Sequence, residues 1–387
     1  MSQIIRNKTG LLPLLVVFVL AGIGTTILGP ILPPLSSQWG MNDAHAGSLF
    51  TAQFLGSALG GLLAGIHPIR SAIAGFAIAT VGLLLLTQAS AHSAAPVTFV
   101  YGLGVGLILT GINLTVSRVA GRKRGVALSW LNFCWSLGAT ICPVLAALFV
   151  VRGVLDGFLL MLAALYVASA IFIFVYSKHY AQTGRVEVPG SGSTHASIRY
   201  FIIYFSALLF LYVGVETTLG GWLSTLASRL HHASVAGAFA LSVSSFFWLA
   251  LLIGRGMSPL LLKKIPETIL QPAAGGLAVV SICLLITAQN FVGVAVAGSL
   301  AGLALAPVFP LSLSFFLSHA GESRSVGVVF AICGTGGAFL PWMTGIVSTH
   351  CRSLQWGLSV PLLAAVLMLG LSLNYVLSAR SCRELNH

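Results

Sequence analysis

The chain has 387 residues, of which 57% are hydrophobic and only 7% are charged. Soluble globular proteins carry about 25% charged residues, so this composition excludes a soluble globule and indicates an integral membrane protein. The formal net charge of +12 would fit a nucleic-acid partner in a soluble protein. Here the charges lie between apolar segments, so we expect membrane topology to explain them and expect no nucleic acid to bind.

Long apolar runs, separated by clusters of charged or turn-forming residues, predict twelve membrane spans of about 20 residues each. In the first half of the chain they lie near residues 11–35, 46–66, 71–90, 95–117, 125–150 and 157–177. In the second half they lie near residues 200–228, 235–254, 268–288, 291–318, 325–349 and 357–379. The predicted fold class is therefore an all-α membrane protein with two six-helix bundles, residues 1–177 and residues 200–387.

The two predicted bundles are joined by residues 178–199, a polar stretch rich in Gly and Ser that predicts a cytoplasmic linker. The bundles also resemble each other in sequence. GIGTTILGPIL from Gly22 aligns with GVETTLGGWLS from Gly214 at an offset of 192, and SLGATICP ending at Pro143 aligns with GTGGAFLP ending at Pro341. Parallel repeats of this kind place a substrate site near the bilayer midplane, between the two halves.

Basic residues are distributed unevenly among the predicted loops. If the N-terminus is cytoplasmic, 16 of the 19 Lys and Arg residues lie on the cytoplasmic side, Arg255 among them, and only Arg152, Arg229 and Arg352 lie outside. This bias is the one that the positive-inside rule requires. We therefore predict a multi-pass protein of a plasma membrane or bacterial inner membrane, with both termini cytoplasmic, and we expect a monomer.

Glu216 is the one acidic residue that is predicted to lie deep in a span, about 16 residues from its start. A carboxylate at that depth costs roughly 2.5–3.5 kcal/mol on insertion scales, so we expect it to face a cavity and to have a function. The structural alternative is a protonated Glu216 that is hydrogen-bonded between helices. No Lys or Arg is predicted in the middle of a span, so we expect Glu216 to have no ionic partner and to be protonated. The same lack of basic residues argues against an anionic substrate and leaves a neutral polar or a cationic one.

Other polar and aromatic residues predicted within spans would suit a polyhydroxylated ligand that binds beside aromatic rings. Tyr212 lies one helical turn before Glu216 and shares its face. For any single Asn or Gln the alternative is an interhelical hydrogen bond, and aromatic residues near span ends, Trp222 included, are alternatively interfacial anchors. The candidate substrate-binding residues are Gln53, Thr110, Asn113, Asn132, Trp135, Tyr212, Glu216, Thr217, Trp222, Ser245 and Trp248.

Signatures of soluble enzymes are missing from the sequence, which has no His-Glu-x-x-His and no Gly-x-Ser-x-Gly. Ser244 and Ser245 have no deep histidine to activate them, so we do not expect an intramembrane enzyme. The six cysteines include no Cys-x-x-Cys pair, and four lie in apolar runs, which indicates small packing residues. We therefore predict no catalytic residue, no metal site and no cofactor.

Twelve spans in two similar halves, a central linker and the basic connection RVAGRKRG from Arg118 resemble the major facilitator superfamily across the whole chain. Its signature between spans two and three is degenerate here, because GLLAGIHPIRSA contains His67 and Arg70 but no Asp. Span seven, LFLYVGVETTLGGWLSTL from Leu209, is similar to the fucose/proton symporter family and its glucose-transporting animal relatives, as are GLGVGLILTGIN and WLNFCWSLGATICP. The resemblance implies that Thr110, Asn113, Asn132 and Glu216 line a sugar cavity.

Two departures from that family bear on coupling. Leu109 stands where an acidic residue commonly precedes the Thr-x-x-Asn of span four, and span one lacks the acidic residue of the proton symporters. Either Glu216 carries the proton, or the protein is a facilitative carrier in which Glu216 hydrogen-bonds the sugar. We predict alternating-access transport of a neutral monosaccharide or polyol. The alternatives are a proton-coupled exporter of amphipathic cations, with Glu216 as counter-charge, and a receptor or scaffold that kept the fold.

Overall fold

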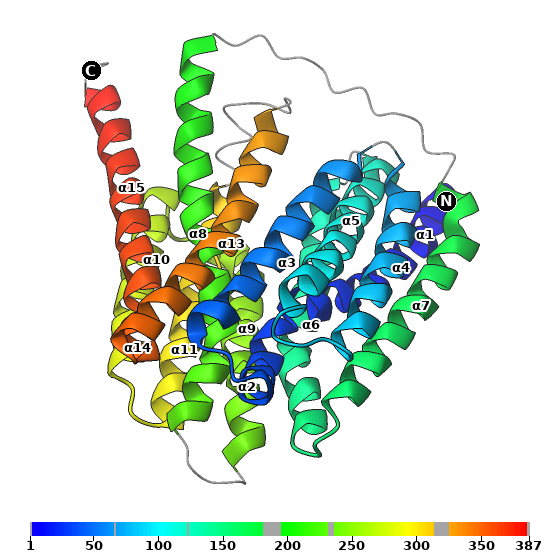
Figure 1. Cartoon of the computed structure of the whole chain (residues 1–387). Coiled ribbons are helices and arrows are strands. Elements are labelled where there is room, and N and C mark those ends of the chain that lie inside the picture. The colour runs from blue at the N-terminus through cyan, green and yellow to red at the C-terminus, as the bar shows by residue number, and fades with distance from the viewer. Residues whose placement is uncertain are drawn as a thin grey trace.

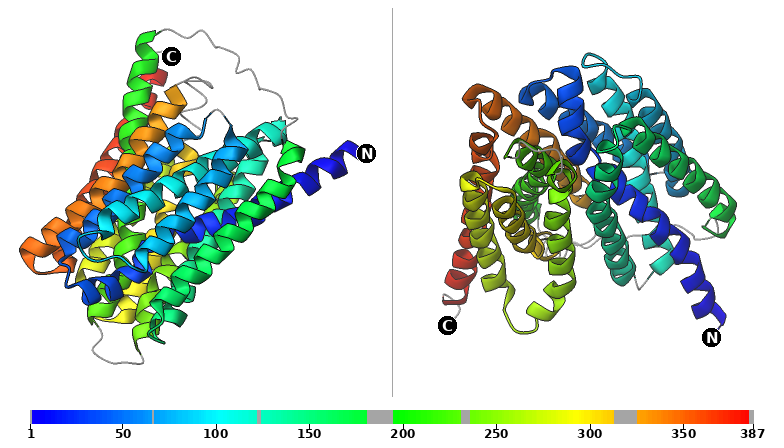
Figure 2. Two further views of the ribbon diagram at one scale, coloured as in Figure 1. Left: turned by 45° about the vertical axis from the view of Figure 1, so that its right-hand side comes forward. Right: turned by 90° about the horizontal axis from the view of Figure 1, so that it is seen from below.

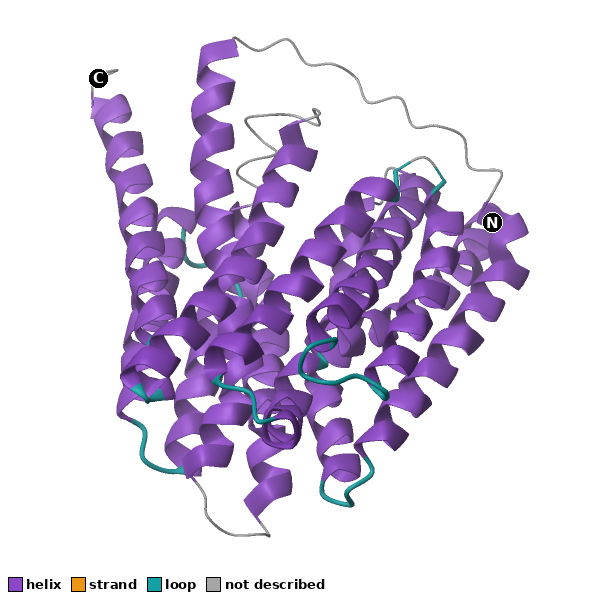
Figure 3. Ribbon diagram, viewed as in Figure 1, coloured by secondary structure: helices purple, strands orange, loops and turns teal. Residues whose placement is uncertain are grey.

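The computed structural model describes residues 2–65, 67–121, 124–180, 195–230, 236–312 and 325–384. The first half of the chain forms α1 (Ser2–Thr26), α2 (Leu28–Trp39), α3 (Asp43–Leu63), α4 (Pro68–Leu86), α5 (Ala94–Ala120), α6 (Arg124–Val150) and α7 (Leu155–Tyr180). The second half forms α8 (His195–Leu230), α9 (Ala236–Leu261), α10 (Glu267–Thr287), α11 (Phe291–Leu305), α13 (Ser325–Cys351), α14 (Leu354–Gly357) and α15 (Ser359–Glu384). Figures 1 and 3 show these helices side by side, joined by loops.

Eleven segments among the described residues are long and apolar enough to cross a membrane. They follow the order of the predicted spans, and α13 coincides with the remaining predicted span at residues 325–349. The all-α membrane fold predicted from the sequence is therefore confirmed. Of the predicted linker, residues 181–194 lie outside the described residues, while its two ends are helical, because α7 continues to Tyr180 and α8 begins at His195.

The two halves of the chain form two groups of helices, which the view from below in Figure 2 separates clearly. Contacts between them are made where α3 packs on α13, α6 on α9, and α2 on α8. The packing of α3 on α13 is close, because a Cβ on Gly47 would lie 3.0 Å from the Cα atom of Trp342 and one on Gly345 would lie 2.2 Å from the carbonyl oxygen of Asp43. Small residues at these crossings let the helix backbones approach each other.

The first span is interrupted at Ile27, between α1 and α2. Pro30, one turn after Thr26, has no N–H to donate to the Thr26 carbonyl. Side chains from other helices bond the carbonyls just before the break: the hydroxyl of Tyr101 donates to the Gly24 carbonyl over 2.8 Å, and Nε2 of Gln53 donates to the Thr25 carbonyl over 2.9 Å. The interrupted backbone is thus held by α5 and α3, as an apolar environment requires.

A polar cluster joins the two halves at the ends of α3, α8 and α13. Both guanidinium Nη atoms of Arg229 donate to the two carboxylate oxygens of Asp43, and the Ser348 hydroxyl donates to the same carboxylate. Beside them, the backbone N–H of Ala44 donates to Oγ1 of Thr349 over 2.9 Å. We call Asp43, Arg229, Ser348 and Thr349 the end cluster; it lies at the opposite end of the molecule from the start of α1 and the end of α15 (Figure 1).

Candidate functional site

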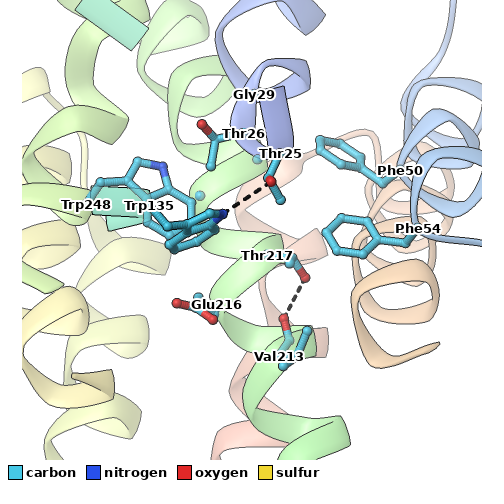
Figure 4. Close-up of a pocket in the computed structure, with 12 residues that line it drawn as sticks. Thr25, Thr26, Gly29, Phe50, Phe54, Trp135, Val213, Glu216, Thr217 and Trp248 are labelled. Carbon is cyan, nitrogen blue, oxygen red and sulfur yellow. Dashed lines mark hydrogen bonds between the residues drawn. The ribbon is translucent and has the colours of Figure 1, made fainter. Parts of the chain in front are cut away.

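A pocket lies between the two halves, about midway along α8, and has a volume of about 110 Å³. A cavity needs about 10–15 Å³ of such volume to hold one water, so the pocket has room for more than a single water. Its lining comes from α1, α2, α3 and α6 on one side and α8 and α9 on the other (Figure 4). The lining residues are Thr25, Thr26, Gly29, Phe50, Phe54, Trp135, Val213, Glu216, Thr217, Gly220, Gly221 and Trp248.

The pocket brings the two sequence repeats together. Thr25 and Thr217 are equivalent at the offset of 192, as are Gly29 and Gly221, and all four line the pocket. The hydroxyl of Thr25 accepts a hydrogen bond from Nε1 of Trp135 over 3.2 Å, which Figure 4 shows as a dashed line. A site that both repeats build is the location expected for a transporter of this architecture.

Aromatic rings form the walls of the pocket. The rings of Trp135 and Trp248 meet edge to face across the two halves, with centroids 5.6 Å apart. The ring of Trp248 lies against the backbone of Gly220, where a Cβ would come within 2.2 Å of Cζ2, and Phe50 lies in the same way against Gly221. Nε1 of Trp248 is buried and finds no partner among the described residues.

Glu216 has an ionic partner, contrary to the prediction from the sequence. Nη2 of Arg255 lies 2.8 Å from Oε1 of Glu216, and the same Nη2 donates to the Tyr212 hydroxyl over 3.0 Å. The prediction is wrong because α9 does not end near residue 254 but continues to Leu261, so Arg255 lies within the helix. The sequence-based placement of Arg255 in a cytoplasmic loop is therefore wrong as well.

Arg255 contacts both halves of the protein. Its Nη1 donates to Oγ of Ser136 on α6 over 3.1 Å, and its guanidinium carbon lies 5.7 Å from the ring centroid of Trp135. The side chain of Arg255 is 19% exposed and that of Glu216 is 9% exposed, so this is a largely buried pair. Water screens such a pair weakly, and removing either partner leaves an uncompensated charge.

Four of the sequence-predicted site residues line the pocket, namely Trp135, Glu216, Thr217 and Trp248. Three others pack next to its lining. Tyr212 lies behind Glu216, where both side chains meet Arg255. Gln53 donates to the carbonyl of Thr25. Trp222 is fully buried and donates from Nε1 to the carbonyl of Pro341 over 3.1 Å, so it is no interfacial anchor.

The remaining four predicted residues do not line this pocket. Ser245 is buried, and its hydroxyl has no partner among the described residues. Thr110 lies against α3, because a Cβ on Gly61 would lie 3.1 Å from its hydroxyl. Asn113 donates from Nδ2 to the carbonyl of Leu109 in its own helix over 2.8 Å, and Asn132 is exposed on α6.

Sequence reasoning missed most of the contribution of the first half to the pocket. Thr25, Thr26 and Gly29 lie in the segment that aligns with the Glu216 region, so the repeat itself was a signal for them. Phe50 and Phe54 lie one turn apart on α3 among other apolar residues, where nothing in the sequence distinguishes a pocket face from a packing face. Arg255 carried a signal as well, as a single basic residue directly after an apolar run.

The model of the Major Facilitator Superfamily matches residues 14–341. Sodium-dependent glucose transporter 1 of Homo sapiens is 22% identical over 364 residues, covering 82% of this chain and 70% of the relative. The glucose/galactose transporter of Brucella abortus is 23% identical over 364 residues, covering 87% of this chain and 86% of the relative.

Solved structures share the fold. A bacterial homolog of the human lysosomal transporter Spinster, inward-facing and unoccupied, matches with a TM-score of 0.74 at 15% identity, covering 97% of each chain. The E. coli fucose:proton symporter FucP matches with a TM-score of 0.64 at 16% identity, covering 95% of this chain and 98% of that chain. The resemblance found in the sequence is thus confirmed: the chain belongs to the Major Facilitator Superfamily and is a multi-pass membrane transporter, not an enzyme.

Proposed function

We propose that this protein transports a neutral monosaccharide or polyol by alternating access, with the pocket between the two halves as the substrate site. The observation that carries the proposal is the pocket itself, in which hydroxyl and carboxylate groups lie between aromatic rings. Such a lining suits a ligand whose hydroxyls surround an apolar ring. Two relatives are named as transporters of glucose or of glucose and galactose, and a protein of the same fold is named a fucose:proton symporter, which supports a sugar.

The charges around the pocket disfavour the alternative substrate class, amphipathic cations. Glu216 is the only charged residue among those that line the pocket, and Arg255 already pairs with it. A cation would therefore find no unpaired carboxylate in the pocket.

For Glu216 we propose the role of a hydrogen-bonding sugar ligand rather than of a proton carrier. Its carboxylate lines the pocket and is already held by Arg255. Span one supplies no second acid: Gly24 stands at the position equivalent to Glu216, and a Cβ there would lie 1.8 Å from the Tyr166 hydroxyl. We therefore propose facilitative transport, in which sugar movement is not coupled to protons.

A thermal-shift screen of the purified protein tests the substrate class, because a ligand that binds only the folded protein raises its apparent stability. Hexoses and polyols are compared with a cationic dye and with no ligand. We expect at least one hexose or polyol to raise the melting temperature in a saturable way, and Trp248→Ala to abolish that shift. A shift with the dye alone would replace the sugar by a cation as substrate.

We further propose that the termini are cytoplasmic and that the end cluster closes the extracellular side. Cys351, exposed at the end of α13, then lies outside the cell, close to Thr349. A membrane-impermeant maleimide added to intact cells should modify Cys351, as mapped by peptide mass spectrometry, and Cys351→Ser should remove the signal. Modification only after permeabilisation would reverse the orientation.

A further inference from the structure

We infer that Arg255 is a positioning residue that sets the charge selectivity of the substrate site. By pairing with Glu216 it balances the charge of the pocket, so that the site accepts an uncharged hydroxylated ring and rejects the corresponding amino sugar and sugar acid. This inference rests on the proposed function and deepens it, since it names the chemical feature that separates substrate from non-substrate.

The geometry places Arg255 behind the pocket wall rather than in it. Glu216 and Trp135 both line the pocket, whereas Arg255 contacts both of them and is not among the lining residues. Its two Nη atoms are engaged by Ser136, Tyr212 and Glu216. A ligand in the pocket therefore meets the carboxylate of Glu216 directly and the guanidinium only through it.

The environment makes this charge balance effective. Both side chains of the pair are largely buried, and the other lining residues are uncharged. In a poorly hydrated site, an unpaired carboxylate attracts a ligand cation far more strongly than the same group does in water. A pair with no net charge offers a cation no such gain, and it makes either charged ligand give up its hydration without compensation.

The hydrogen bond from Arg255 to Ser136 connects the Arg255–Glu216 pair to the other half of the protein. Arg255 and Glu216 belong to α9 and α8, whereas Ser136 belongs to α6, so the guanidinium bridges the interface at which the pocket lies. The residue that balances the charge is therefore itself held by the interface that must rearrange during transport. A structural ion pair confined to one helix bundle would not need this third contact.

Charge-matched ligands and variants test the inference. The ligands are D-glucose, D-glucosamine and D-glucuronate, three derivatives of one ring, used where the amine is protonated and the acid ionised. The variants are Arg255→Gln, which leaves the carboxylate unpaired, and Glu216→Gln, which leaves the guanidinium unpaired. Arg255→Lys keeps the charge, and the double variant Arg255→Gln/Glu216→Gln removes both charges together, which guards against a single variant that fails to fold. Affinity is measured by thermal shift and by equilibrium binding on the purified proteins.

We expect the wild-type protein and Arg255→Lys to prefer glucose over both charged derivatives. Arg255→Gln should prefer glucosamine and Glu216→Gln glucuronate, each by about tenfold or more over the wild-type ratio, while the double variant should still prefer glucose. The double variant decides the point if the single variants do not fold. Equal affinity of the double variant for glucose and for glucosamine or glucuronate would overturn the inference. A merely structural role for the pair would lower all affinities together and leave their ratios unchanged.

The outcomes separate this inference from the proposed function. Glucose binding by the wild-type protein, with unchanged ratios in the single variants, overturns the inference and leaves the proposed function standing. A swap of preference in the variants without glucose binding by the wild-type protein supports Arg255 as the residue that sets charge selectivity and overturns glucose as the neutral ligand. No binding of any of the three ligands by any of the proteins overturns both.

Discussion

Thr25 and Thr217 stand at equivalent positions of the two repeats, yet their hydroxyls have different bonding partners in the same pocket. Oγ1 of Thr25 accepts from Trp135 and donates to the carbonyl of Ala21, whereas Oγ1 of Thr217 donates within its own helix, to the carbonyl of Val213 over 2.6 Å. The hydroxyl of Thr25 thus fixes a pocket wall, and that of Thr217 does not. The pseudo-symmetry of the chain does not extend to the function of these two side chains.

Replacing each threonine by valine, which keeps its shape, should separate these functions. Thr25→Val leaves Nε1 of Trp135 without its acceptor, so we expect a loss of about 0.5–1.5 kcal/mol in stability for this partly buried bond. Thr217→Val removes only a bond to its own helix, which contributes little. Melting temperatures of the two variants check the difference; equal losses would contradict the unequal roles of the two hydroxyls.

Trp248→Phe should weaken ligand binding, because it changes a wall of the pocket. Its Nε1 has no partner among the described residues, so the empty protein loses no hydrogen bond, and we expect stability to fall only through the packing that the smaller ring loses at this buried position. Trp135→Phe is the matched control, because that indole already donates to Thr25 in the empty protein. Binding isotherms and melting curves of both variants decide the point: ligand binding by Trp248→Phe as tight as by the wild type would show that the ligand does not contact this ring.

Gly220→Ala should destabilise the protein, because the new Cβ would lie 2.2 Å from the ring of Trp248. Overpacking of this kind costs about 1–3 kcal/mol, and moving the ring also changes the shape of the pocket. Gly276→Ala on α10 is the control, since its Cβ would meet no described atom within 4 Å and alanine is the better helix former. We expect a lower melting temperature and weaker ligand binding for Gly220→Ala alone.

Asp43→Asn should favour the state in which the end cluster is open. The change removes the charge that Arg229 and Ser348 bind, and since Arg229 is half exposed we expect a shift of about 1–2 kcal/mol. Distances between spin labels at Met41 and Ser353 measure the opening, and Asp156→Asn, an exposed acid at the start of α7, serves as the control. Identical distance distributions for Asp43→Asn and the wild type would mean that the cluster does not hold the closed state.

Glu216→Gln tests whether the carboxyl group couples transport to protons. Gln keeps the shape and much of the hydrogen bonding of Glu but cannot take up or release a proton. If Glu216 only binds sugar, net uptake and counterflow exchange in proteoliposomes should fall together, and wild-type uptake should be insensitive to an imposed pH gradient. Sugar-induced alkalinisation by the wild-type protein that the variant lacks would instead assign proton coupling to Glu216.

The fold could be predicted from the sequence because membrane spans are long, apolar and bounded by charge. The same rule caused the error at Arg255. Gly254, Arg255 and Gly256 resemble the end of a span, but a long side chain that finds Glu216 inside the protein can stay within the helix.

The site was less predictable, because a polar side chain in the middle of a span can face the lipid, a neighbouring helix or the pocket. Asn113 bonds its own helix and Asn132 is exposed on α6, although residue type alone suits both to a sugar. Glu216 and Trp135 line the pocket, and no periodicity in their helices distinguishes them from the asparagines. Only the packing of α9 against α6 selects among these surroundings.

The interruption at Ile27 divides the first span into two mechanical units. Tyr101, Tyr166 and Trp135 attach α1 to its own half. α2 packs on α8 of the other half, with Gly29 against Gly220, and also contacts α6 and α3 of its own half. A movement of one half relative to the other therefore does not require the whole span to slide. We expect a movement between the halves to bend this span at Ile27, so that α2 keeps its contact with α8 while α1 keeps its contacts with its own half.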